Sequence, residues 1–167
     1  MNRLNITCKI LVGLLLATAA AADGKVEIGG PMRSYTLPDQ FGKVHTLAPE
    51  TRAVLIASER PVSTAINTWL SAKENGFLTR NHVEYVSDIS PMPAPITKLF
   101  ALPKMRSFPF RIFLNRKDGF QNVYPRQEAR MALFLLDDTH KVLDIRFLEK
   151  PEQLDAIVDT NRKGAES

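Results

Sequence analysis

The sequence predicts an α/β domain, and three observations lead to that prediction. Segments typical of strands and of helices alternate along the chain. Two of the strand segments, 53–57 and 131–136, are apolar at every position, as expected for strands that are buried on both faces of a sheet. An amphipathic pattern with helical spacing follows the first of them over 62–75, as in domains where helices cover a central sheet.

The first 22 residues have the pattern of a secretory signal peptide. Arg3 and Lys9 form a short positive region, an apolar stretch follows, and Ala20 and Ala22 supply small side chains before a cleavage site. Asp23 ends the apolar run before it reaches the roughly 20 residues that a membrane-spanning helix needs. We therefore expect cleavage near Ala22, a periplasmic location, and no membrane anchor after cleavage.

Composition limits the possible partners of the cleaved chain. Removing residues 1–22 from the 167 leaves 145, which is about one domain, 23–167. It also removes the cations Arg3 and Lys9 and no acid, so the formal charge falls from +4 to +2. No run of five or six like charges is present either, and the sequence therefore argues against a nucleic-acid partner. A domain of this size with 44% hydrophobic residues buries enough surface to fold without disulfides.

The domain is predicted to begin with a β-hairpin and a buried strand. Half-apolar segments at 35–37 and 44–47 flank the turn residues 38–43, which is the pattern of two short strands joined by a turn. The apolar run 53–57 is the first strand of the central sheet.

A helix is predicted over 62–75. Its apolar residues recur on one face, Trp69 among them as a core residue, and Gly76 occupies the position of a left-handed C-terminal cap. A second strand is predicted over 83–86.

The proline-rich stretch 90–95 is predicted to lead into a short helix. This helix carries Ile96, Leu99 and Phe100 on one side, and Pro103 is expected to end it.

The last third of the chain is predicted to complete the sheet. A third strand is predicted over 110–114, whereas 120–124 fits either a strand or a helical turn. The run 131–136 is predicted to be a central strand. Alternation over 142–148 predicts a half-exposed strand with Leu143, Ile145 and Phe147 on one face, and a final helix is expected from Pro151 onward.

Several phrases of the chain resemble those of peroxiredoxins and related AhpC-TSA-like, thioredoxin-like proteins. Residues 35–43, Tyr-Thr-Leu-Pro-Asp-Gln-Phe-Gly-Lys, resemble the opening phrase F-x-L-x-D-Q-x-G-K of that group and likewise precede a buried strand. The hairpin expected from 131–137 and 142–148 resembles their closing hairpin. The resemblance implies a thioredoxin-like fold over 23–167, with a central mixed sheet flanked by helices and an N-terminal β-hairpin.

A closer likeness is to small exported bacterial thioredoxin-like proteins. The phrases that carry it lie at 86–93, 98–103 and 108–111. Some proteins of this group are labelled "FAD/FMN-containing dehydrogenase", so the resemblance implies FAD or FMN as the alternative to having no cofactor.

The chain lacks a cysteine at the position where proteins of this fold carry their reactive thiol. Catalytic relatives present a cysteine or a C-x-x-C pair in the loop and first helical turn after the first core strand, where the helix N-terminus lowers the thiol pKa. The corresponding residues 58–65 contain hydroxyls and no thiol, and the one cysteine, Cys8, lies in the predicted signal peptide. The sequence therefore excludes thiol peroxidase and disulfide oxidoreductase activity for this chain acting alone. The proline that relatives place before their penultimate strand is also missing from 127–130.

Other catalytic motifs are absent from the sequence. His45, His82 and His140 lie in three separate segments without metal-ligand spacing, so we expect no metal site. The acidic stretch 137–140 is interpreted as a hairpin turn. No phosphate-binding loop or nucleophile elbow is present. The cations Arg106, Arg111, Arg116 and Lys117, interleaved with phenylalanines, form the densest cationic region. They are interpreted as solvated residues around a buried strand, and alternatively as a flavin-phosphate site.

The leading hypothesis is a periplasmic, cysteine-free thioredoxin-like protein that binds an unknown periplasmic protein without catalysis. The alternative is a flavin-dependent oxidoreductase. The candidate partner-binding residues lie after the first core strand and in the proline-containing loops. They are Glu59, Arg60, Pro61, Ser63, Thr64, Met92, Pro93, Phe108 and Pro109.

Overall fold

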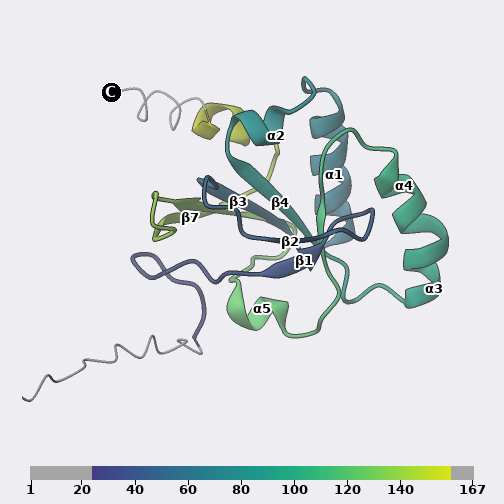
Figure 1. Cartoon of the computed structure of the whole chain (residues 1–167), viewed down its shortest axis with the longest axis horizontal. Helices are drawn as coiled ribbons and strands as arrows, with labels where there is room; N and C mark the ends of the chain where they lie inside the picture. Colours follow the sequence, from purple (N-terminus) through teal and green to yellow (C-terminus); the bar gives the residue numbers. More distant parts are fainter. Residues whose placement is uncertain (1–23, 159–167) are drawn as a thin grey trace, which may run out of the picture.

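The computed structural model describes residues 24–158 (Figure 1). The predicted signal peptide, with Cys8, and the end of the predicted C-terminal helix lie outside the described residues. Within 24–158, no helix combines the length and the apolar character needed to cross a membrane.

A five-stranded mixed sheet forms the centre of the structure, in the order β5-β4-β3-β6-β7. β3 and β4 are parallel, as are β4 and β5, whereas β6 runs antiparallel to both of its neighbours. The predicted α/β class is therefore confirmed. The strands are β3 (Ala53–Ala57), β4 (Val83–Asp88), β5 (Phe113–Asn115), β6 (Met131–Leu136) and β7 (Val142–Leu148).

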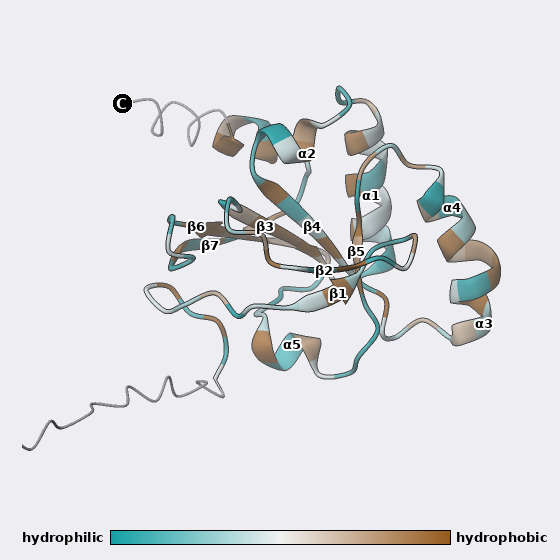
Figure 2. Ribbon diagram, viewed as in Figure 1, coloured by the Kyte–Doolittle hydropathy of each residue, from teal (hydrophilic) through white to brown (hydrophobic). Residues whose placement is uncertain are grey.

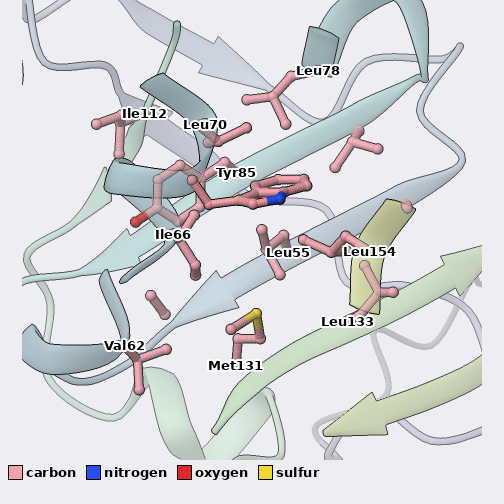
Figure 3. Close-up of a cluster of buried hydrophobic side chains, with 14 of the residues drawn as sticks. Leu55, Val62, Ile66, Leu70, Leu78, Tyr85, Ile112, Met131, Leu133 and Leu154 are labelled. Carbon is pink, nitrogen blue, oxygen red and sulfur yellow. The ribbon is translucent and has the colours of Figure 1, made fainter. Parts of the chain in front are cut away.

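Side chains alternate between two hydrophobic layers on either side of this sheet. From β3, Leu55 faces one layer and Val54 and Ile56 face the other, as the two-residue period of a strand requires. The first layer packs beneath helices α1 (Arg60–Ser71), α2 (Phe77–Arg80) and α4 (Leu102–Arg106), together with the helical residues 153–158 (Figure 3).

The second layer lies beneath the N-terminal hairpin and a short helix. The strands β1 (Thr36–Pro38) and β2 (Val44–Thr46) pair antiparallel, which confirms the predicted hairpin. Helix α5 (Phe120–Val123) packs on the same side, so the undecided segment 120–124 is a helical turn. Because apolar side chains fill both layers, the strands 53–57 and 131–136 are buried at every position, as predicted.

The first helix was placed too late in the sequence. Helix α1 begins at Arg60, with Pro61 in its first turn, and ends at Ser71, not Asn75. Gly76 does have a positive φ of 80°, but it precedes α2 instead of capping α1. Trp69 lies in the core as predicted, since it is 8% exposed and packs edge-on against Phe77.

The segment after β4 is one continuous helical stretch, which the sequence prediction ended too early. It comprises α3 (Ala94–Ile96), the π-helical turn η1 (Thr97–Ala101) and α4. Pro103 does not stop it, because Pro103 lies in the first turn of α4, just after the π-helical turn. At that position the missing N–H of proline interrupts no hydrogen bond of a regular α-helix.

Two strand predictions also differ from the structure. The third strand is shorter and begins later, since β5 starts at Phe113. Leu143 was expected to share a face with Ile145 and Phe147, but it is 57% exposed. The pairing of β6 with β7 is irregular beside it, where Leu135 is opposite Asp144 and Leu136 is opposite Val142. The extra residue Leu143 is therefore turned out of the alternating pattern, as in a β-bulge.

Candidate functional site

The candidate site lies at the carboxyl edge of the parallel strands. Ser58 and Glu59 follow β3, Ser87 and Asp88 end β4, and Asn115 ends β5. Binding and catalytic residues in α/β sheets gather at this edge, because the connections that leave the strands are free to vary there. Helix α1 starts at the same edge, directly after Glu59.

Three hydroxyl groups meet beneath the first turn of α1. The Ser63 Oγ lies 3.0 Å from the Tyr85 hydroxyl and 3.3 Å from the Ser87 Oγ. Tyr85 and Ser87 share one face of β4, opposite Leu55 and Ala57 of β3. Burial raises the pKa of Tyr85, and the hydrogen bonds with Ser63 and Ser87 offset only part of this rise. The Tyr85 hydroxyl is therefore neutral at physiological pH.

A second contact ties the start of α1 to the loop before β6. The Glu59 Oε1 accepts a hydrogen bond from the Ala129 N–H at 3.1 Å. Ala129 has a positive φ of 55°, which is unusual for a residue with a Cβ. The residues 24–158 contain no cis peptide bond, and residues 127–130, directly before β6, include no proline.

Asp88 and Asn115 join the ends of β4 and β5. The Asn115 Nδ2 donates to Asp88 Oδ1 at 2.9 Å and to the Lys117 carbonyl at 2.8 Å. The same Asp88 oxygen accepts from the Ser90 N–H. These buried groups have partners within the fold, which fixes the loop that leaves β4.

The structure brings together only part of the predicted binding set. Arg60, Pro61 and Thr64 are exposed on the first turn of α1, while Glu59 and Ser63 are half-buried and hydrogen-bonded as described above. Met92 and Pro93 follow the carboxyl end of β4, and Met92 packs against the core.

Phe108 and Pro109 lie toward the opposite edge of the sheet. They precede the amino end of β5, and Pro109 and Phe110 line a hollow with Leu70, near the C-terminal end of α1, and with Phe77, the first residue of α2. Phe108 stacks on Phe110 with ring centroids 5.1 Å apart. These two residues therefore do not belong to one surface with Glu59 to Thr64.

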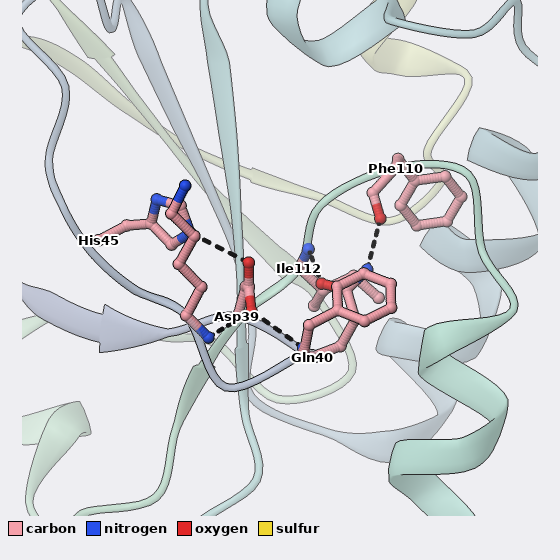
Figure 4. A network of polar contacts seen from close by, with 7 residues as sticks. Asp39, Gln40, His45, Phe110 and Ile112 are labelled. Atoms are coloured by element: carbon pink, nitrogen blue, oxygen red, sulfur yellow. Dashed lines mark hydrogen bonds and ion pairs between the residues drawn. The ribbon is translucent and has the colours of Figure 1, made fainter.

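The histidines do not supply a general base to the hydroxyl cluster. His82 and His140 have positive φ angles in turns, before β4 and between β6 and β7. His45 instead contacts Asp39 at the hairpin, with its Nε2 3.0 Å from Asp39 Oδ2 (Figure 4). Ser63 therefore has neutral hydroxyl partners and lacks the base that activates a serine nucleophile. In the described part of the chain, no cluster of three potential metal ligands is found.

Asp39 organises the hairpin turn. Its Oδ1 accepts hydrogen bonds from the N–H groups of Phe41 and Lys43, both at 2.9 Å. Burial raises the pKa of Asp39, but the hydrogen bonds from His45 and from these two backbone groups outweigh it, so the pKa lies below its usual value. The role of Asp39 is thus structural.

The cationic and aromatic residues considered for a flavin phosphate are dispersed. The Arg106 Nε donates to the Gln40 carbonyl at 2.9 Å. The Gln40 side chain in turn donates to the Phe110 carbonyl and accepts from the Ile112 N–H (Figure 4). Arg111 is exposed on the approach to β5. These contacts connect the hairpin to β5 and do not gather the cations around a common point.

Sequence reasoning missed Tyr85, Ser87 and Ala129 as parts of this edge. Tyr85 lies in the predicted strand 83–86, and a strand extended by two residues would have placed Ser87 on the same face. The position of Ala129 had no signal in the sequence, because its positive φ and its bond to Glu59 depend on the folded chain.

Comparison with solved structures identifies the fold. A putative protein disulfide isomerase from Bacteroides thetaiotaomicron has a TM-score of 0.56 at 16% identity, over 83% of this chain and 89% of that one. A mutant of PrxQ from Xylella fastidiosa has a TM-score of 0.58 at 12% identity, over 85% and 99%. A putative thiol:disulfide interchange protein DsbE from Chlorobium tepidum has a TM-score of 0.53 at 16% identity, over 80% and 94%.

The chain therefore has a thioredoxin-like fold, which confirms the predicted fold class. Identities this low show the fold and no more. The sequence matches no protein-family model and no curated protein.

Proposed function

We propose that this chain is an exported, periplasmic thioredoxin-like protein that binds a partner protein and does not catalyse thiol chemistry. The observation that carries the proposal is the composition of the site at the start of α1. Ser63 bonds there to the neutral hydroxyls of Tyr85 and Ser87, and residues 24–158 contain no cysteine.

A serine hydroxyl does not replace a thiol at this position. It ionises far less readily and has no disulfide or sulfenic state, so it supplies neither a peroxidatic nucleophile nor a redox couple. The start of α1 still offers an exposed surface that the rest of the fold holds in place. Arg60, Pro61 and Thr64 lie on a helical turn that Glu59 ties to the loop before β6.

Site-specific photo-crosslinking in cells tests this proposal. A photo-crosslinking amino acid at Thr64, exposed on the first turn of α1, is expected to give a covalent adduct with one protein of defined mass. Thr79, exposed on α2, is the matched control and is expected to give none. Equal adduct patterns at the two positions, or no adduct at Thr64 and at Arg60, would argue against a partner at this surface.

The same material separates the remaining alternatives. Fractionation and intact mass report whether residues 1–22 are removed and whether the product is periplasmic. A flavin absorbance or fluorescence in the isolated protein would favour the oxidoreductase alternative, whereas disulfide or hydroperoxide reduction at enzymatic rates would overturn the non-catalytic role.

A further inference from the structure

The helical stretch 94–106 exposes an apolar stripe on its outer side. Ile96, Leu99 and Phe100 are 46%, 69% and 70% exposed, and Pro103 is exposed as well. Their spacing of three, four and seven residues places them along one side of a helix. Thr97, Leu102 and Met105 are buried, and Leu102 and Met105 belong to the first hydrophobic layer.

The π-helical turn accounts for this division. A π-helical turn brings residues five apart close to one another, so that Thr97 and Leu102 both face the core, and the Leu102 N–H bonds to the Thr97 carbonyl. Ile96, Leu99 and Phe100 lie on the outside. The segment lies at the margin of the molecule, where α3 and α4 are labelled in Figure 1, and Figure 2 shows its hydrophobic residues there.

The helical stretch that carries the stripe is also positively charged. Lys98, Lys104 and Arg106 are exposed on it, and the Arg106 Nε donates to the Gln40 carbonyl as well. No aspartate or glutamate occurs between Asp88 and Asp118, and no salt bridge pairs these cations with an acid in the part of the chain that the structure describes. An apolar stripe with cations that no acid pairs complements a partner surface that has an apolar layer below negatively charged groups.

We propose that this face, defined by Ile96, Leu99, Phe100, Lys98, Lys104 and Arg106, docks onto an anionic lipid bilayer. A bilayer offers hydrocarbon to the projecting side chains and anionic headgroups to the cations around them, without a preformed groove. A protein partner would have to supply both a fitted apolar pocket and a ring of carboxylates. Since no described helix can span a membrane, the contact is peripheral. None of the six residues of this face belongs to the first turn of α1, so the inference is tested separately from the proposed partner site.

Vesicle co-sedimentation tests the inference on the exported protein, with its N-terminus defined by intact mass so that an uncleaved apolar leader does not contribute. Binding is expected to vesicles of phosphatidylethanolamine and phosphatidylglycerol and to be weaker by about tenfold or more on phosphatidylcholine alone. Raising the salt concentration should weaken it further.

Variants assign the binding to this face. Replacing Leu99→Ser and Phe100→Ser together should reduce vesicle binding by at least about tenfold, and Lys104→Gln should reduce it roughly fivefold. Leu143→Ser and Lys141→Gln are matched controls, because both residues are exposed on the β6–β7 hairpin, and they should leave binding unchanged.

Two results would overturn the proposal. One is binding that does not depend on anionic lipid or that survives the Leu99→Ser, Phe100→Ser double change in a protein with native circular dichroism. The other comes from cells in which a photo-crosslinking phenylalanine analogue replaces Phe100. A discrete protein adduct without a lipid adduct would show that this face serves an acidic protein instead.

Discussion

Removing the hydroxyls of Ser63 and Tyr85, singly and together, probes whether the cluster at the start of α1 is a structural network. Tyr85 is 1% exposed, and its hydroxyl lies 3.0 Å from the Ser63 Oγ. Ser63→Ala leaves that buried hydroxyl with Ser87 alone, which we expect to cost about 1–2 kcal/mol of unfolding free energy. Tyr85→Phe leaves Ser63 half-exposed and able to bind water, so its cost should be about 0.5–1.5 kcal/mol.

The cost of the double variant should differ from the sum of the two single variants. The double variant loses the Ser63–Tyr85 contact once instead of twice, but it also removes both neighbours of the buried Ser87 hydroxyl. A coupling free energy of about 0.5–1.5 kcal/mol is expected for residues in direct contact. Urea denaturation followed by circular dichroism measures each term, provided that the m-value stays constant. Strictly additive costs would refute the reasoning, because they would mean that the two hydroxyls do not depend on one another.

Three further predictions concern the hairpin, the loop before β6 and the core. Asp39→Asn should destabilise the protein by about 1–3 kcal/mol at pH 7. The pKa of Asp39 is lowered in the folded state. The contribution of its carboxylate to the unfolding free energy is therefore present above the ordinary pKa of about 3.9 and is lost as the pH falls through the folded-state pKa. Denaturation curves of variant and parent should thus converge in acid and not in alkali. Ala129→Gly should leave the unfolding free energy unchanged or raise it by up to about 1 kcal/mol, since glycine relieves the positive φ at a cost in chain entropy. A loss of stability comparable to that of Ala53→Gly in β3 would contradict this. Phe134→Ala, at a fully buried position, should cost about 3–5 kcal/mol in thermal or urea unfolding, whereas Phe41→Ala, 63% exposed, should cost less than about 0.5 kcal/mol.

The central strands could be predicted from the sequence because a single physical constraint determines their pattern. A strand covered on both faces must be apolar throughout, and 53–57 and 131–136 satisfy that constraint without reference to any other segment. The ends of α1 could not be predicted equally well. Its start depends on Pro61, which suits a first turn, and its end at Ser71 has no strong stop signal in the sequence.

The helical stretch after β4 shows a different limit of sequence patterns. The grouping of Ile96, Leu99 and Phe100 on one side was predicted, but the pattern does not state whether that side faces the core or solvent. The answer depends on the π-helical turn, which lets Thr97, Leu102 and Met105 form the buried side and lets the helix continue past Pro103. A local hydrogen-bond shift of this kind has no reliable signature in residue type.

The location of the candidate site could be predicted from the sequence, but the contacts between its residues could not. The position after the first core strand follows from the order of elements, whereas the neighbours of Ser63 depend on the register that sets Leu55 opposite Tyr85 and Ala57 opposite Ser87. Phe108 and Pro109 were grouped with this site because of their sequence phrase. Phe108 and Pro109 instead lie toward the other edge of the sheet, at the end of the crossover from β4 to β5. Because β4 and β5 are parallel, the chain must return to the amino-end edge before β5 begins.

The proposal that the chain does not catalyse thiol chemistry rests on more than the absence of a sulfur atom at this site. The groups that contact Ser63 are neutral hydroxyls, and burial keeps the nearest of them, Tyr85, in its neutral form. Besides the N-terminus of α1, a thiolate in that position would have only neutral side-chain donors to stabilise it, while partial burial would oppose its charge. On the outer side, Glu59 places a carboxylate against the Ala129 N–H, which adds negative charge beside the start of α1. Both effects disfavour a thiolate, so the residues around Ser63 have the composition expected of a supporting surface and not of a reactive centre that lacks one atom.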